Sequence, residues 1–138
     1  MAKRSGTTKS SSPAKEKLLK AINNLPHSSM SDRQFDLENP IPYVGKEISR
    51  DIILNQDRWY DNEIGVKNIE ISKIETVQPI VMKSTLLSKI NGDSDTKDIP
   101  VILYKGRYLL FDGNHTVAIK KLRGDKSVKV RLLRYIEK

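Results

Sequence analysis

Apolar residues recur at helical spacing in two places in the first half of the chain. Ser12 and Pro13 are a capping residue and a first-turn proline, and the apolar positions after them predict a helix over residues 13–24. A second apolar stripe predicts a helix over residues 46–59. The polar, proline-containing stretch between them, residues 27–42, is expected to be irregular.

The middle of the chain contains one clear strand and one ambiguous segment. Apolar and polar residues alternate over residues 66–71, which predicts a strand. Residues 80–82 are apolar and partly β-branched, as in a strand, but a helical stripe over residues 80–90 overlaps them. We expect the helix, followed by a polar loop over residues 93–98.

The last third of the chain has the most regular pattern. Two apolar runs, residues 99–104 and 107–111, flank a tight turn and predict a β-hairpin. Apolar positions at helical spacing then predict a helix that ends at Gly124. Residues 127–133 alternate again, which predicts a last strand.

These elements predict one small α+β domain with a mixed sheet. The chain has 138 residues, which leaves room for one ordinary hydrophobic core. We assign residues 66–138 to this domain and residues 13–65 to a helical N-terminal region. Residues 1–12 are polar, basic and rich in Ser and Thr, so they are expected to form a disordered tail.

The composition excludes several classes of site. The chain has no cysteine and only 2 histidines, which excludes disulfides, thiolate metal sites, cysteine catalysis and a zinc centre with three histidine ligands. It also has no apolar run near the roughly 18 residues of a membrane span, nor an apolar N-terminal signal. We therefore expect a soluble, cytoplasmic protein that has no membrane partner.

The formal net charge of +8 is unevenly distributed along the chain. Residues 1–20 carry six Lys and Arg against one Glu, and residues 105–138 carry ten against three acidic residues. Clustered positive charge attracts polyanions, so nucleic acid is the expected partner. The side chains that we expect to contact it are Lys120, Lys121, Arg123, Lys129 and Arg131.

The turn between the hairpin and the last helix combines features of an anion site. Gly113 permits a backbone conformation that larger residues avoid, and Asn114 is a helix-capping residue. The first amides of a helix point outward with partial positive charge, and phosphate is their most common ligand. We assign phosphate binding to Gly113, Asn114 and Thr116, although the same residues also occur in ordinary turns.

Two titratable side chains in this turn suggest chemistry. Asp112 is a candidate catalytic residue and metal ligand, because a carboxylate holds a divalent cation or accepts a proton. His115 is the candidate acid/base within the first helical turn. A divalent cation and a nucleotide are therefore the expected cofactors.

The string of elements from about residue 66 to 133 resembles the ParB/sulfiredoxin superfamily. The residues that carry the resemblance are Ile69-Glu70-Ile71, Gln78-Pro79, Ile99-Pro100-Val101-Ile102, Gly106 to Asp112, Gly113-Asn114-His115 and Gly124 to Val130. The resemblance is to a short ParB-like nuclease domain of the phage or mobile-element type. It implies the fold of that superfamily and a turn that binds nucleotide or phosphate.

The turn departs from the family patterns at defined positions. Asn114 stands where sulfiredoxins carry their nucleophilic cysteine, so the chain lacks the group for cysteine-sulfinate reduction. The segment Asn114-His115-Thr116 replaces the Glu-Arg-Arg of ParB proteins. Many members have D-G-x-H-R, of which this chain keeps Asp112, Gly113 and His115 and has Thr116 at the arginine position.

The sequence thus predicts binding of nucleic acid or nucleotide phosphate, with metal-dependent phosphodiester or phosphoryl-transfer chemistry at the turn. Two alternatives remain open at this point. One is a non-catalytic DNA- or protein-binding module with a degenerate turn, and the other is a small-molecule kinase.

Overall fold

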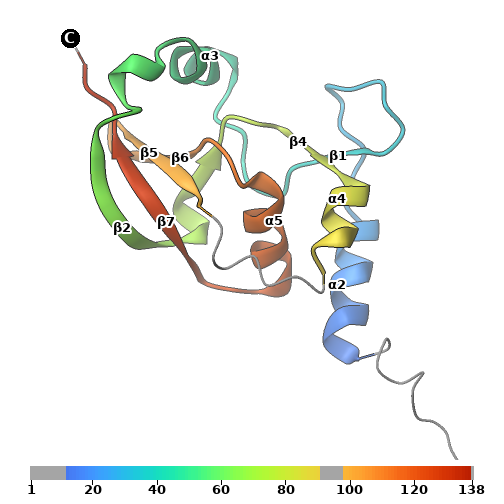
Figure 1. The fold of residues 1–138 in the computed structure, drawn as a ribbon. Helices are drawn as coiled ribbons and strands as arrows, with labels where there is room; N and C mark the ends of the chain where they lie inside the picture. The colour runs from blue at the N-terminus through green and yellow to red at the C-terminus, as the bar shows by residue number, and fades with distance from the viewer. Residues whose placement is uncertain (1–11, 91–97, 138) are drawn as a thin grey trace, which may run out of the picture.

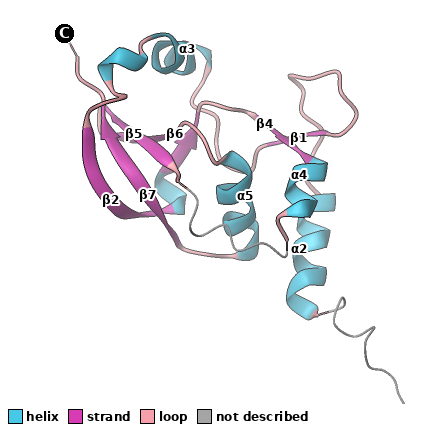
Figure 2. Cartoon of the chain, in the orientation of Figure 1, coloured by secondary structure: helices cyan, strands magenta, loops and turns pink. Residues whose placement is uncertain are grey.

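The computed structural model describes residues 12–90 and 98–137 (Figures 1 and 2). The predicted disorder of residues 1–11, and the predicted loop over residues 93–97, lie outside the described residues. The α-helices are α2 (Pro13–Asn23), α3 (Lys46–Leu54), α4 (Lys83–Ser88) and α5 (Asn114–Arg123). The strands are β1 (Asp36–Glu38), β2 (Glu63–Glu70), β3 (Ile74–Thr76), β4 (Ile80–Met82), β5 (Pro100–Tyr104), β6 (Arg107–Leu110) and β7 (Ser127–Arg134).

The strands form two sheets. The larger has five strands in the order β2-β7-β5-β6-β3, with antiparallel pairs β2/β7 and β5/β6 and parallel pairs β5/β7 and β3/β6. The smaller is the antiparallel pair β1/β4. The prediction of an α+β fold with a mixed sheet is therefore confirmed.

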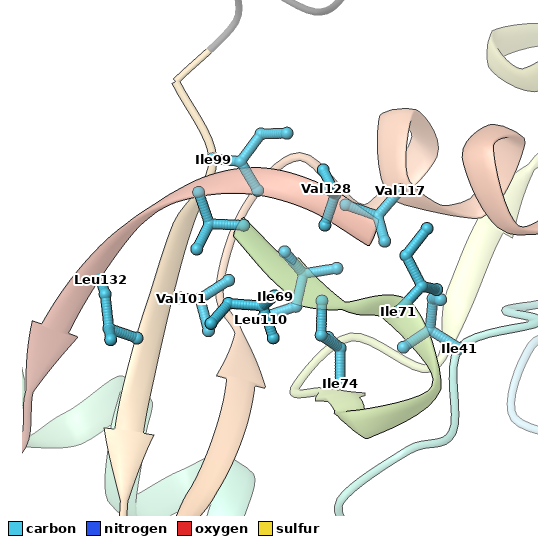
Figure 3. Packing of buried hydrophobic residues seen from close by; sticks show 11 residues of the cluster. Ile41, Ile69, Ile71, Ile74, Ile99, Val101, Leu110, Val117, Val128 and Leu132 are labelled. Carbon is cyan, nitrogen blue, oxygen red and sulfur yellow. The ribbon is translucent and has the colours of Figure 1, made fainter. Parts of the chain in front are cut away.

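Helix α5 occupies the centre of the molecule, between the five-stranded sheet and the helices α2 and α4 (Figure 1). Its Val117 joins a cluster of sheet residues that includes Val101, Leu110 and Val128 (Figure 3). Its Ala118 and Ile119 pack on the opposite side, against apolar side chains of α2, α4 and the small sheet. Because both sides of α5 are buried, the position of its N-terminus is fixed by packing.

Helix α3 covers the other face of the five-stranded sheet. Its Ile52 is fully buried in a cluster with Trp59, Ile102 and Leu109. Adjacent residues of β5, such as Val101 and Ile102, face opposite clusters, as the period of two in a strand requires. Both faces of the sheet thus contribute to the core.

The helix predicted over residues 80–90 is wrong in its first part. Residues Ile80–Met82 form β4, and α4 begins only at Lys83. Strand β4 pairs with β1, and the β-branched Val81 is fully buried. The partner strand decides the conformation here, and it lies about 40 residues earlier in the chain.

The helix predicted over residues 46–59 ends early, at Leu54. Asn55 leaves helical geometry, and its side-chain amide donates hydrogen bonds to the backbone oxygen of Asp51 (2.9 Å) and to its Oδ1 (2.7 Å). Such side chains compete with the helix for backbone acceptors. A 3₁₀ turn, Gln56–Arg58, then brings Trp59 into the core.

Two strands were not predicted. The stretch 27–42, expected to be irregular, contains β1, and β3 follows a 3₁₀ turn, Ile71–Lys73, at which the predicted strand over residues 66–71 ends. Each of these strands has three residues, too few for an alternating pattern to stand out. Strand β2 also begins at Glu63, three residues before its predicted start.

Candidate functional site

The predicted turn lines a surface pocket of about 530 Å³ at the N-terminus of α5. All five residues from Asp112 to Thr116 contribute to the lining. The remaining wall comes from distant segments: the end of α3, residues 77–78 and helix α4. The structure therefore brings the predicted catalytic and phosphate-binding residues together, and it adds residues that sequence reasoning had not assigned to the site.

Gly113 makes the turn into α5 possible. Its φ of +83° lies in the left-handed region, and a Cβ at this position would stand 3.3 Å from Ile99 Cγ1. Gly113 itself is the N-cap, and no side chain caps the helix. The prediction that Asn114 caps α5 is thus wrong, because Asn114 is the first helical residue and its side chain is used elsewhere.

The side chain of Asn114 belongs to a buried hydrogen-bond network. Its Oδ1 accepts a hydrogen bond from Asn39 Nδ2 (3.0 Å) and another from Thr76 Oγ1. Asn39 also donates to the backbone oxygen of Gln78 (3.0 Å), and its Oδ1 accepts from the backbone amide of Ile41 (2.9 Å). The Asn114 side chain therefore holds the start of α5 in place, and its backbone amide is what it offers to a ligand.

Three amides at the start of α5 are available to an anion. The Gly113 amide donates to Asp112 Oδ1 (2.8 Å), so it is already used. The amides of Asn114, His115 and Thr116 have no hydrogen-bond acceptor among the described residues. Such amides carry the positive end of the helix dipole.

Thr116 adds an unusual feature to this N-terminus. Its side chain is 1% exposed, and its Oγ1 is the one buried side-chain polar atom in the described part of the chain that has no hydrogen-bond partner. Leaving a buried hydroxyl unpaired costs about 1–3 kcal/mol. An unpaired buried hydroxyl in a folded protein calls for an explanation, and an ion or ligand in the adjacent pocket is one that fits its position.

His115 is held as a neutral acceptor in this structure. Its Nε2 accepts a hydrogen bond from the backbone amide of Met82 (2.9 Å), which places the proton of the neutral ring on Nδ1. Burial, and secondarily the positive charge of Lys89, lower the pKa of His115. With Nε2 engaged, Nδ1 is the ring nitrogen that carries the proton, and the role of His115 as a catalytic acid/base stays a prediction.

Lys89, at the end of α4, is the cation that lines the pocket. Sequence reasoning missed it because it lies 27 residues before Thr116 and belongs to another helix. Lys120, Lys121 and Arg123, by contrast, are in the last turn of α5, about 10 Å or more from its start. Among the described residues that line the pocket, Lys89 thus supplies the positive charge.

The residues predicted to contact nucleic acid do not form one free cationic surface. Lys121 Nζ donates to the backbone oxygen of Pro40 (2.7 Å), and Arg123 pairs with Asp125 (2.7 Å). Lys120 is 9% exposed.

On the sheet, Arg131 pairs with Asp98 (2.9 Å) and Glu63 (3.7 Å), while Lys129 is exposed. Neither residue lines the pocket. Nucleic-acid binding by these five residues stays a prediction.

Asp112 is exposed, and it is the sole carboxylate among the described residues that line the pocket. No group of three His, Asp or Glu in the described segments is placed to hold a metal ion. Magnesium is often bound through one or two carboxylates and the phosphates of its substrate. Asp112 fits that arrangement, and its assignment as a metal ligand stays a prediction.

Comparison of the chain with family models, curated proteins and solved structures gave no match. None of the helices in the described segments is long and apolar enough to cross a bilayer.

The position of Gly113 gives a stability prediction. Gly113→Ala should lower the free energy of unfolding by more than Gly124→Ala, measured by urea denaturation. Both glycines have a positive φ, which costs an L-residue about 1–2 kcal/mol, but a Cβ at Gly124 meets nothing within 4 Å. Equal losses in the two variants would contradict the close approach to Ile99.

The environment of His115 gives a pH prediction. Because its pKa is lowered in the folded state, the unfolded chain binds more protons, and the free energy of unfolding should fall as the pH drops below about 6.5. His115→Gln keeps an acceptor for the Met82 amide and should show a smaller fall between pH 7.5 and 5.5. Lys89→Met should be intermediate, since burial is the larger cause. Identical pH profiles for wild type and His115→Gln would contradict this assignment.

Proposed function

We propose that the chain is a phosphate-binding domain of the ParB/sulfiredoxin type, which binds a nucleotide through the N-terminus of α5. The observation that carries the proposal is the buried, unpartnered hydroxyl of Thr116 beside three available amides. The amides and the hydroxyl donate hydrogen bonds to phosphate oxygens, and Lys89 supplies a positive charge. The hydrogen-bond donors and the positive charge of Lys89 therefore suit an anion such as phosphate.

The rest of the pocket supports a ligand larger than phosphate alone. Ile53, Val77 and Phe111 form an apolar wall, and Phe111 packs against Trp59 with ring centroids 4.8 Å apart. A cavity of this kind, with a few convergent polar groups, is typical of small-molecule sites. A base or sugar is expected against the apolar wall, with the phosphate at α5.

The order of elements supports the assignment to this superfamily. Strand β2, helix α4, the β5/β6 hairpin, α5 and β7 occur in this order along the chain, with the short strands β3 and β4 between β2 and α4. The turn with Asp112, Gly113 and His115 opens α5, the position at which the superfamily pattern has its ligand-binding turn. The proposed activity is binding, and catalysis by Asp112 and His115 is a separate proposal that depends on it.

Thr116→Val separates a ligand-binding role from a structural one. The substitution removes the hydroxyl and keeps the side-chain shape, so the free protein should be as stable as wild type or more stable, by up to about 1 kcal/mol. Its affinity for ATP or pyrophosphate should fall about tenfold, as expected for losing one hydrogen bond to a charged group. Thermal denaturation and isothermal calorimetry measure the two effects.

Thr76→Val is the matched control. Thr76 Oγ1 donates to Asn114 and accepts from the Gln78 amide (2.9 Å), so this variant should lose stability. Adenosine, which lacks phosphate, should not stabilise the wild type. An affinity that is unchanged in Thr116→Val, or binding of an oligonucleotide but not of a nucleotide, would contradict the proposal.

A further inference from the structure

A second groove, of about 670 Å³, lies on the other side of α4 from the pocket. Thr85 and Lys89, four residues apart, face the pocket, whereas Lys83 and Leu87 face the groove. We call it the α4 groove. The residues that line it include Arg33, Phe35, Asp36, Met82, Lys83 and Leu87.

The walls of the α4 groove expose large apolar side chains. Phe35 is 63% exposed on one wall, and Met82 and Leu87 are 44% and 36% exposed on the other. Single exposed apolar residues are common, but apolar side chains that face one another across a groove mark a binding surface. Exposed apolar surface is thus concentrated in the groove, where a bound partner would remove it from water.

The groove is built by hydrogen bonds between its two walls. The Lys83 amide donates to the backbone oxygen of Phe35 (3.1 Å), and Asp36 pairs with Met82 in the small sheet. On the other side of β1, His27 and Leu37 form a further bridge. The backbone that carries Phe35 and Leu87 is therefore ordered before a partner binds, which reduces the conformational entropy lost on binding.

The charges of the α4 groove have one sign. The carboxylate of Asp36, a residue that is 9% exposed, accepts a hydrogen bond from Ser31 Oγ (2.7 Å), so it is withdrawn from the surface. The guanidinium of Arg33 and the ammonium of Lys83 make no ion pair with any residue that the structure describes. The accessible charges of the groove are positive, and a partner must supply carboxylates.

We propose that the α4 groove binds an acidic segment of a partner protein, which places an apolar side chain between Phe35 and Leu87 and its carboxylates beside Arg33 and Lys83.

Strand addition does not explain the groove. One edge of β1 pairs with β4 and the other is bridged by His27, and on β4 the Met82 amide donates to His115. A nucleic acid is disfavoured because Phe35 is the one aromatic side chain among the described residues that line the groove, and Met82 and Leu87 offer no second platform for stacking bases. This proposal is independent of nucleotide binding in the pocket.

Two synthetic amphipathic peptides with the same Leu and Phe positions test the proposal, one with Glu and one with Lys at its polar positions. Titrated into the ¹⁵N-labelled full chain, the Glu peptide should shift the amide signals of Phe35, Met82 and Lys83, with weaker binding as salt is added. The Lys peptide, and an oligothymidine, should leave these signals in place up to about 1 mM.

Point variants test whether the Glu peptide binds in the α4 groove. Phe35→Ser and Lys83→Glu should each weaken binding of the Glu peptide about tenfold. Leu54→Ser is the matched control, because Leu54 is 71% exposed but lies outside the α4 groove, and it should bind as wild type does.

Four outcomes of the peptide and oligothymidine titrations would overturn the proposal. These are equal binding of both peptides, shifts confined to other surfaces, oligothymidine binding in the groove, and no shift with the Glu peptide at about 1 mM. Self-association of the chain through Phe35 would also overturn it, in favour of a second copy as the occupant.

Discussion

The candidate site depends on the hydrogen bonds of the Asn114 side chain. Its Oδ1 accepts hydrogen bonds from Asn39 Nδ2 and Thr76 Oγ1. These bonds connect the first residue of α5 to the loop after β1 and to the end of β3. All of these side chains are buried, so removing Asn114 would take one hydrogen-bond acceptor from both Asn39 and Thr76 in a low dielectric. The network fixes the direction of the amides that follow, while Gly113 supplies the backbone turn.

One short segment, the β4/α4 junction, separates the pocket from the α4 groove. Met82 donates its amide to His115 on the side of the pocket and exposes its side chain to the α4 groove. Helix α4 then presents Lys89 to the pocket and Leu87 to the groove. The same six-residue helix therefore serves two surfaces with different chemistry: the pocket has convergent hydrogen-bond donors, and the groove has apolar walls with positive charges.

The sequence predicts the fold best where its signals are local. The β5/β6 hairpin and α5, with their turn glycines and regular periodicity, lie where the pattern put them. Strands β1, β3 and β4 are short and form by pairing with distant residues, which no local pattern encodes.

The candidate site likewise contains features that a local sequence pattern does not encode. The turn at Gly113 was predicted from its residue types, but the inward orientation of Asn114 and the presence of Lys89 result from tertiary contacts. The residue types of the turn placed Thr116 among the phosphate-binding candidates, but they did not show that its hydroxyl is buried and unpaired. Its importance appears only when burial and hydrogen bonding are considered together.

Anion binding at α5 is tested most directly by following the backbone amide signals of the ¹⁵N-labelled protein during titration with pyrophosphate. We expect saturable shifts of Asn114, His115 and Thr116, while the amide of Arg123 at the opposite end of α5 stays unchanged. Pyrophosphate binding that leaves the three N-terminal amides unshifted, or no binding at all, would contradict it.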